Sequence, residues 1–117
     1  MSVLTKIITV SSNGENDMID ITRQTHEAIK ASGLQDGIVV IFVSGSTASI
    51  TTIEYEHDNT WHDGNGHSHV RASLIGPSLT VPFKNKSLML GTWQQIVVLE
   101  MDTRPRKRKI VLQMIGE

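Results

Sequence analysis

A continuous β-branched apolar run, GIVVIFV over residues 37–43, constrains the fold more than any other part of this 117-residue chain. Uninterrupted apolar runs of this length and composition are typical of strands that are covered on both faces. We therefore expect residues 37–43 to form a central strand of the core. The hydroxyl-rich sequence SGSTA over residues 44–48 predicts a turn, and the β-branched sequence SITTIE over residues 49–54 predicts the next strand.

One amphipathic segment precedes this strand. Apolar residues recur at helical spacing after Met18, and Asn16 is a suitable N-cap, with Asp17 and Asp20 in the positive first turns. Gly33 provides the usual C-terminal stop. We therefore predict one long helix that begins at Asn16 and ends before Gly33.

The remaining segments favour β-structure. Residues 4–10 alternate like a strand and stop at the turn sequence SSNG. Residues 78–83 and 87–90 predict a hairpin around a KNK turn, in which Pro82 belongs at an edge or a bulge.

Residues 93–101 and 109–115 predict a second hairpin. One helix on a mostly antiparallel sheet or sandwich gives an α+β fold, and the length suits a single domain over residues 1–117.

Composition limits the chemistry. The chain has no cysteine, which excludes disulfides and thiolate catalysis and fits a reducing compartment. Its formal net charge of -1 argues against a surface devoted to nucleic acid or to anionic membrane. No stretch approaches membrane-spanning length, and the N-terminal sequence lacks a signal-like pattern. We therefore expect a cytoplasmic protein with no membrane partner.

Four of the five histidines lie within residues 55–69, among acids, amides and glycines. Imidazole titrates near neutral pH and is the commonest metal ligand, so this stretch is the first candidate for function. Its spacing matches no standard zinc motif and leaves three readings open: a metal site, acid–base or phosphate contacts without metal, or a structural loop. The candidate ligands for a divalent metal such as zinc are His57, His62, His67 and His69.

Two other segments contain candidate ligand-binding groups. Ser46 and Thr47 in the hydroxyl-rich turn suit phosphate, although such turns also serve local hydrogen bonding alone. Thr92, Trp93 and Gln94 could line a pocket with hydrogen bonds and an aromatic surface, the alternative being a tight turn with Trp93 in the core.

The basic run RPRKRK over residues 104–109 has the composition of a nucleic-acid patch. It lies between two expected strands and lacks interleaved aromatic residues, so we interpret it as a solvated hairpin loop. Nucleic acid is therefore not an expected partner.

The C-terminal half closely resembles the YjbQ-like family. The resemblance is carried by SHVRASLIGPSLTVP over residues 68–82, by LGTWQQI over residues 90–96 and by the terminal GE, and it extends over nearly the whole chain. Members of this family are described as secondary thiamine-phosphate synthases, which join a hydroxymethylpyrimidine diphosphate to a thiazole phosphate with loss of pyrophosphate. For this family the synthase reaction is a side activity, and the physiological substrate is unsettled.

The resemblance implies an α+β fold with a β-sandwich core and a homotrimer with sites near subunit boundaries. It also implies a pocket for a small phosphorylated molecule, formed by His57, His69, Glu54 and residues 91–94. In such a transferase His57 or His69 would act as general acid or phosphate ligand, Arg71 would neutralise phosphate, and Glu54 would orient a histidine or bind metal. The alternative function is a His-rich metal-binding protein or a metal-dependent hydrolase.

This chain departs from the family pattern in two places. Many members carry His-Thr-Thr-Ala or His-Thr-Ser-Ala where this chain has glycine at position 45 followed by Ser46, Thr47 and alanine, which leaves His62 and His67 as candidate substitutes. Relatives usually also carry a helix-bearing segment between the strand that ends at Glu54 and the histidine stretch. In this chain the sequence passes from Glu54 directly into that stretch.

Overall fold

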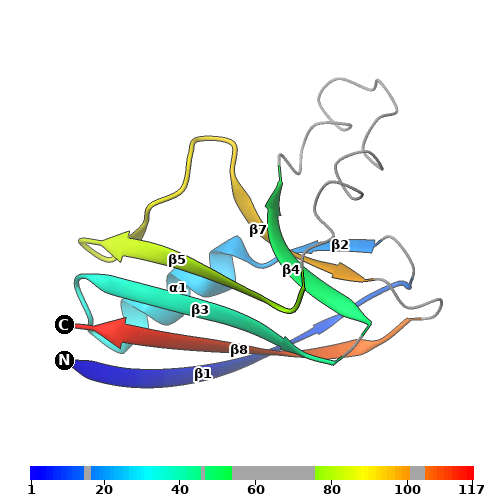
Figure 1. The fold of residues 1–117 in the computed structure, drawn as a ribbon, viewed down its shortest axis with the longest axis horizontal. Helices are drawn as coiled ribbons and strands as arrows, with labels where there is room; N and C mark the ends of the chain where they lie inside the picture. The colour runs from blue at the N-terminus through cyan, green and yellow to red at the C-terminus, as the bar shows by residue number, and fades with distance from the viewer. Residues whose placement is uncertain (15–16, 46, 54–75, 101–104) are drawn as a thin grey trace.

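Two antiparallel sheets and one helix make up the part of the chain that the computed structural model describes, residues 1–14, 17–45, 47–53, 76–100 and 105–117 (Figure 1). The five-stranded sheet has the order β1-β8-β3-β5-β6, with bounds Ser2–Ser11, Lys107–Gly116, Gly37–Ser44, Ser78–Lys84 and Ser87–Leu88. The three-stranded sheet has the order β2-β7-β4, with bounds Asp17–Asp20, Gln95–Glu100 and Ala48–Ile53. Helix α1 spans Thr22–Ser32. The predicted α+β class with antiparallel sheets is confirmed.

The predicted central strand is β3, which pairs with β8 on one side and with β5 on the other. Its inward residues Val39, Ile41 and Val43 are fully buried, as a core strand requires. Its outward residues differ from expectation, because Ile38 is 39% exposed and Phe42 is 41% exposed. Within the described part of the chain, β3 is therefore covered on one face only.

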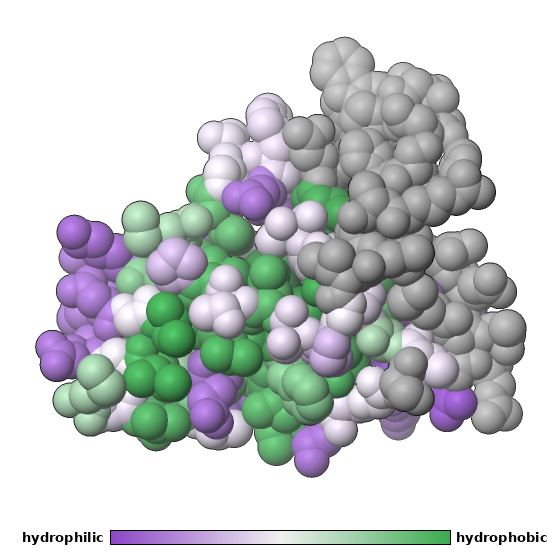
Figure 2. All heavy atoms as spheres, viewed as in Figure 1, coloured by the Kyte–Doolittle hydropathy of each residue, from purple (hydrophilic) through white to green (hydrophobic). Residues whose placement is uncertain are grey.

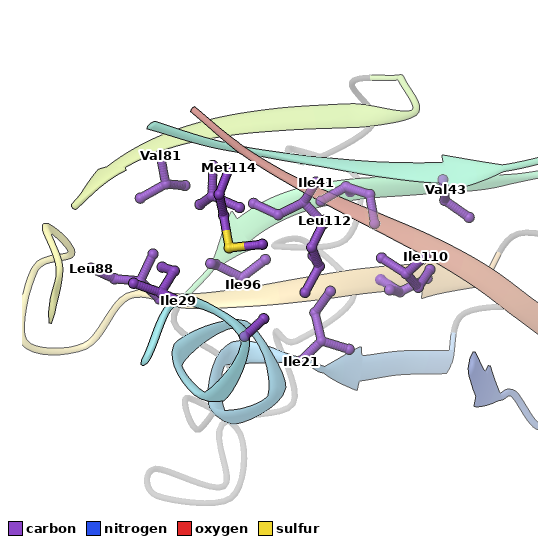
Figure 3. Packing of buried hydrophobic residues seen from close by; sticks show 14 of the residues in the cluster. Ile21, Ile29, Ile41, Val43, Val81, Leu88, Ile96, Ile110, Leu112 and Met114 are labelled. Carbon is purple, nitrogen blue, oxygen red and sulfur yellow. The ribbon is translucent and has the colours of Figure 1, made fainter. Parts of the chain in front are cut away.

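The core lies between the five-stranded sheet on one side and the three-stranded sheet with α1 on the other (Figure 3). Ile41 and Leu112 project from the larger sheet toward Ile96 of β7 and Ile21 at the start of α1, and all four are fully buried. Every second residue of β8 is buried, and these residues pack with the apolar face of α1 in one cluster.

The helix begins later than its sequence pattern predicts. Asp17–Asp20 forms strand β2, which pairs with Val97 to Glu100 of β7, and the Ile21 amide extends that pairing to the Ile96 carbonyl at 2.8 Å. The Asp20 carboxylate then accepts a hydrogen bond from the Thr22 amide at 2.9 Å, which satisfies one free amide of the first helical turn. The predicted stop is confirmed, because Gly33 has the left-handed φ of 78°.

The first predicted hairpin is confirmed and the second is wrong. Strands β5 and β6 pair around Asn85 and Lys86, whose φ values of 52° and 64° form the tight turn. Strands β7 and β8 lie in different sheets, so the chain crosses from one layer to the other between them.

Two glycines allow the C-terminus to close onto β3. Gly37 pairs with Gly116, and a Cβ atom on Gly37 would lie 2.1 Å from the Ile115 carbonyl oxygen. The Asp36 and Glu117 backbones exchange hydrogen bonds of 3.2 and 3.0 Å beside this contact. Backbone atoms therefore occupy the space that a side chain would need.

Among the described residues no helix is long and apolar enough to cross a bilayer.

Candidate functional site

The predicted site residues divide between described and undescribed parts of the chain. Thr47, Thr92, Trp93 and Gln94 are described. The histidine stretch lies outside the described residues, and so do the other predicted site residues; the full set is Ser46, Glu54, His57, His62, His67, His69 and Arg71. The structure therefore shows two parts of the predicted site, one at Thr47 and one at residues 92–94.

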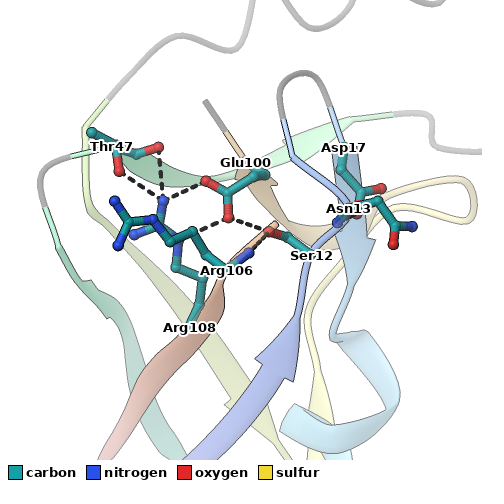
Figure 4. A network of polar contacts seen from close by, with 7 residues as sticks. All are labelled: Ser12, Asn13, Asp17, Thr47, Glu100, Arg106 and Arg108. Carbon is teal, nitrogen blue, oxygen red and sulfur yellow. Dashed lines mark hydrogen bonds and ion pairs between the residues drawn. The ribbon is translucent and has the colours of Figure 1, made fainter. Parts of the chain in front are cut away.

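One guanidinium nitrogen makes two hydrogen bonds to Thr47. Nη2 of Arg108 donates to the Thr47 hydroxyl at 2.7 Å and to the Thr47 carbonyl at 3.2 Å (Figure 4). These two bonds fix both the side chain and the backbone at the point where the turn enters β4.

Arg108 is in turn held by Glu100. Nε of Arg108 donates to Glu100 Oε1 at 2.8 Å, and Nη2 donates to Glu100 Oε2, so the two groups form a fork-shaped ion pair. The Ser12 hydroxyl also donates to Glu100 Oε1, and the Arg106 amide donates to Ser12 Oγ at 3.0 Å. Arg108 is only 6% exposed and Glu100 only 1%. We refer to Ser12, Thr47, Glu100 and Arg108 as the inter-sheet cluster, because Glu100 belongs to β7 and Arg108 to β8.

The inter-sheet cluster corrects the interpretation of the basic run as a solvated loop. Strand β8 begins at Lys107, and Arg108 lies on its buried face while Lys109 lies on its exposed face. The sequence patterns did not predict the buried contacts among Arg108, Glu100 and Ser12. A signal was present, because Arg108 is in phase with Ile110 at the period of two that marks one face of a strand.

The turn before Thr47 fits closely around the guanidinium. Gly45 has φ of 149°, and a Cβ atom at this position would lie 3.0 Å from Nη1 of Arg108. Position 45, where many members of the family that this chain resembles carry histidine, therefore faces an arginine in this chain.

The second part of the predicted site is a turn that Gln94 closes. The Gln94 amide donates to the Gly91 carbonyl at 3.0 Å, and Gln94 Oε1 accepts from the Gly91 amide at 2.8 Å. Gln94 Nε2 donates to the Thr52 hydroxyl at 3.2 Å, which ties the turn to β4. Both polar atoms of this side chain thus support the turn.

Trp93 projects from this turn into solvent. It is 71% exposed, so the alternative of a core tryptophan is wrong. Thr92 is also exposed. The turn therefore presents a flat aromatic surface beside a hydroxyl, a combination that can stack on and hydrogen-bond to a planar ring.

The two described parts lie at opposite ends of β4. Ala48, next to Thr47, pairs with Glu100, and Ile53 pairs with Gln95, next to Gln94. A strand of this length spans roughly 17 Å. Ile53 is also the last described residue before the histidine stretch.

The chain also has an exposed apolar face that the sequence analysis did not single out. The pairing register places Val3, Ile7, Ile38 and Phe42 on the outer side of the five-stranded sheet, and all four are exposed. Figure 2 shows hydrophobic side chains gathered over these strands. A patch of this kind on one side of a sheet is typical of an interaction surface.

A groove of about 440 Å³ lies between β1 and α1, lined on the strand side by Leu4, Lys6 and Ile8 and on the helix side by Glu27 and Ala28 among others. Of the predicted site residues that the structure describes, Thr47, Thr92, Trp93 and Gln94, none lines it.

The described part of the chain contains no group of three or more His, Asp or Glu side chains placed to hold a metal ion. The four histidines predicted as metal ligands all lie outside the described residues.

Comparison with protein families gives a match to the family described as "UPF0047 protein YjbQ-like", over residues 6–63 and 53–117. A UPF0047 protein of Methanocaldococcus jannaschii is 33% identical, with 92% of this chain and 91% of that protein covered. A UPF0047 protein of Methanothermobacter thermautotrophicus is 32% identical, with 100% of this chain and 95% of that protein covered.

Solved structures give the same result. A YbjQ-like protein of unknown function from Sulfolobus solfataricus superposes with a TM-score of 0.81 at 30% identity, covering 99% of both chains. A protein of the YjbQ/UPF0047 family from Clostridium acetobutylicum superposes with a TM-score of 0.75 at 31% identity, covering 94% of this chain and 99% of that one.

The family match comes in two pieces that meet at residues 53–63. The alignment with the Methanothermobacter protein also runs over 137 positions against the 117 residues of this chain. Both observations agree with a shorter connection after β4 than relatives have.

Proposed function

The chain belongs to the UPF0047 family of YjbQ-like proteins, and we propose that it is a transferase of the thiamine-phosphate synthase type. The reaction joins a pyrimidine that carries a methylene diphosphate to a thiazole phosphate. A carbon–nitrogen bond forms, the carbon–oxygen bond to the diphosphate breaks, and pyrophosphate leaves. The synthase is a side activity of a site built for a small phosphorylated molecule, in a cytoplasmic protein.

The exposed indole of Trp93 is the observation that supports this proposal most directly. A side chain of this size at 71% exposure leaves a large apolar surface in water, which a planar heterocycle would cover by stacking. Gln94 holds the turn in place through its bonds to Gly91 and Thr52, so the indole is presented from a fixed backbone. Thr92 supplies a neighbouring hydroxyl.

Phosphate binding is assigned to hydroxyls and to the undescribed segment. Ser46 and Thr47 bind phosphate oxygens, and Arg71 neutralises their charge. His57 or His69 protonates the leaving pyrophosphate or binds it, and Glu54 orients a histidine. Because Thr47 and Trp93 lie at opposite ends of β4, we assign the phosphate end and the ring end of the substrates to different ends of that strand.

The proposal includes a homotrimer. Ile38 and Phe42 of β3, together with Val3 and Ile7 of β1, form an outer sheet face whose burial between subunits would remove apolar surface from water. The trimer thus covers the face of β3 whose sequence had led us to expect burial on both sides.

Incubation of the purified protein with the pyrimidine diphosphate and the thiazole phosphate tests the transferase. Thiamine phosphate formation should be lost in His69→Ala and retained in Lys30→Ala, which changes an exposed residue of α1. Product no greater than that of His69→Ala would reject the activity.

The alternative function, a metal-binding protein or metal-dependent hydrolase, is favoured by one observation, the clustering of His57, His62, His67 and His69 with nearby acids. Metal analysis after purification without chelators separates the two. Stoichiometric zinc together with thermal stabilisation by added zinc would favour the metal protein, whereas neither result is expected for the transferase without metal.

A further inference from the structure

We propose that the open edge of β1 and the groove beside it bind an extended peptide segment of another protein, which adds a strand to the five-stranded sheet. The segment carries apolar side chains at alternate positions and an acidic side chain between them, opposite Lys6. This surface uses none of the residues assigned to the transferase.

Strand β1 forms a long open edge of the larger sheet. Its 10 residues pair with β8 on one side, and no described strand pairs with the other side (Figure 1). Val3 is 59% exposed, Leu4 38% and Ile7 49%, so this edge lies in solvent. The strand has no proline, and its unbroken register with β8 leaves no bulge. An edge of this kind is a template for pairing with another strand.

The backbone groups of odd-numbered residues in β1 face the open edge. The Ser12 amide donates to the Arg106 carbonyl at 2.7 Å, and the unbroken register places every second residue before Ser12 in the same kind of pair. The other side of β8 agrees, because Glu117 exchanges hydrogen bonds with Asp36, so odd-numbered residues of β8 bond to β3. Four residues of β1 thus direct their amides and carbonyls outward: Val3, Thr5, Ile7 and Thr9.

The groove of about 440 Å³ between β1 and α1 lies where the side chains of an added strand would point. Leu4, Lys6 and Ile8 alternate with the outward backbone groups, and they line one wall. Ala28 and Ala31 of α1 line the other wall, and their small side chains leave room. An added strand would bond to the open edge and place every second side chain in this groove.

Lys6 determines which segment fits. It lies between Leu4 and Ile8 on the groove side of β1, and no described carboxylate pairs with it. The carboxylate that lines the groove, that of Glu27, pairs with Arg23 at 3.7 Å. In an added antiparallel strand, the residues opposite even-numbered positions form the pairs whose side chains approach most closely. An acidic side chain opposite Lys6, with apolar ones on either side, therefore complements this edge.

The occupant is a different chain and not a second copy of this one. Lys6 is the only charged residue of β1, so β1 of another subunit would bring no carboxylate to it. The proposed subunit contact uses the side chains of Val3 and Ile7, which lie on the opposite face of the sheet. The peptide and the subunit contact can therefore be present together.

The probe is the labelled peptide fluorescein-TVTDTVT-amide, titrated with the protein and followed by fluorescence anisotropy. Its valines and aspartate would enter the groove, and its threonines would bond to the edge. One control peptide, TVTKTVT, reverses the charge. The other is N-methylated at the two threonines beside the aspartate, which removes strand hydrogen bonds and keeps the side chains. We expect saturable binding of the first peptide and at least about tenfold weaker binding of the N-methylated form.

Variants of the protein separate the backbone from the charge. Thr5→Pro removes an outward N–H and leaves the pairing with β8, whereas Thr5→Val keeps this amide and loses the same hydroxyl bond to Gln113. We expect Thr5→Pro to bind the aspartate peptide about tenfold more weakly than Thr5→Val. Lys6→Glu should make TVTKTVT the better ligand. Lys30→Glu, the same change at an exposed position of α1 outside the groove, should leave the preference unchanged.

Hydrogen exchange tests the edge without ligand. In the free protein the amides of Val3, Thr5 and Ile7 should exchange fast and those of Leu4 and Lys6 slowly, and the peptide should protect the first group. Slow exchange at all five would show that the edge is already paired and would overturn the proposal.

Three binding results would also overturn the proposal. Equal binding of the N-methylated peptide would indicate an apolar groove that adds no strand. A smaller oligomer for Thr5→Pro than for Thr5→Val in sedimentation equilibrium would place a second copy on this edge. Absence of saturable binding of the aspartate peptide up to about 1 mM would exclude a peptide of this pattern.

Discussion

Gln94 donates from its side-chain amide to the Thr52 hydroxyl at 3.2 Å, and this bond ties the turn that carries Trp93 to strand β4. The same side chain accepts from the Gly91 amide at 2.8 Å. Gln94, a residue predicted to contact substrate, thus holds the turn that presents its neighbour Trp93.

Removal of the indole should weaken binding of the pyrimidine ring. For Trp93→Ala we expect a loss of about 1–3 kcal/mol, the typical contribution of an aromatic residue that stacks on a base. Trp93→Phe should recover part of it. Met89→Ala, which removes another exposed apolar side chain, is the control. Calorimetric titration with the pyrimidine diphosphate measures the effect, and equal affinity in Trp93→Ala and Met89→Ala would show that the indole is not a stacking surface.

The buried pair of Glu100 and Arg108 should matter strongly for stability when only one partner is removed. Arg108→Ala leaves the Glu100 carboxylate buried without its cation, and we expect the free energy of unfolding to fall by about 3–5 kcal/mol. The change should appear in urea unfolding monitored by circular dichroism.

The matched control for this prediction is Lys109→Ala on the exposed face of β8, which should change the free energy of unfolding by less than about 0.5 kcal/mol. If the two alanine variants unfold at the same urea concentration, the ion pair is not a significant source of stability.

Local sequence patterns correctly predicted the features that depend on only a few neighbouring residues. The apolar run became β3, the KNK turn became the β5–β6 connection, and Gly33 ends α1. The start of the helix was mispredicted because Asp17 to Asp20 fit both a helix and a strand. Pairing with the edge of β7 makes these residues a strand, and that edge exists only in the folded sheet.

The site was harder to predict for the same reason. Thr47 and Trp93 each follow from local composition, but their separation along β4 depends on strand register. Arg108 was hidden within a basic run, since its burial depends on the layer to which β8 belongs. Contacts between the two sheets join residues that are far apart in sequence, and composition does not predict such contacts.

The contact between Gly37 and Gly116 should tolerate no side chain. In Gly37→Ala the new Cβ atom would lie 2.1 Å from a backbone oxygen, so the strands must move apart. We expect a loss of about 1–3 kcal/mol in the free energy of unfolding, as for other overpacked positions. At Gly91 the nearest atom to an added Cβ is 3.4 Å away, so Gly91→Ala is the control. Chemical denaturation of both variants decides, and equal stability would show that the closure is loose.

A charge on the outer face of the five-stranded sheet should break the proposed homotrimer without unfolding the subunit. Phe42 is exposed in the single chain, so Phe42→Lys removes no core contact, but in a trimer it would place an unpaired charge in an apolar interface. Gln35→Lys adds the same charge at an exposed position outside the strands of that face. Sedimentation equilibrium should give a trimer for the unchanged protein and for Gln35→Lys, and a monomer with unchanged circular dichroism for Phe42→Lys. A trimer that persists in Phe42→Lys would place the subunit contacts on another surface.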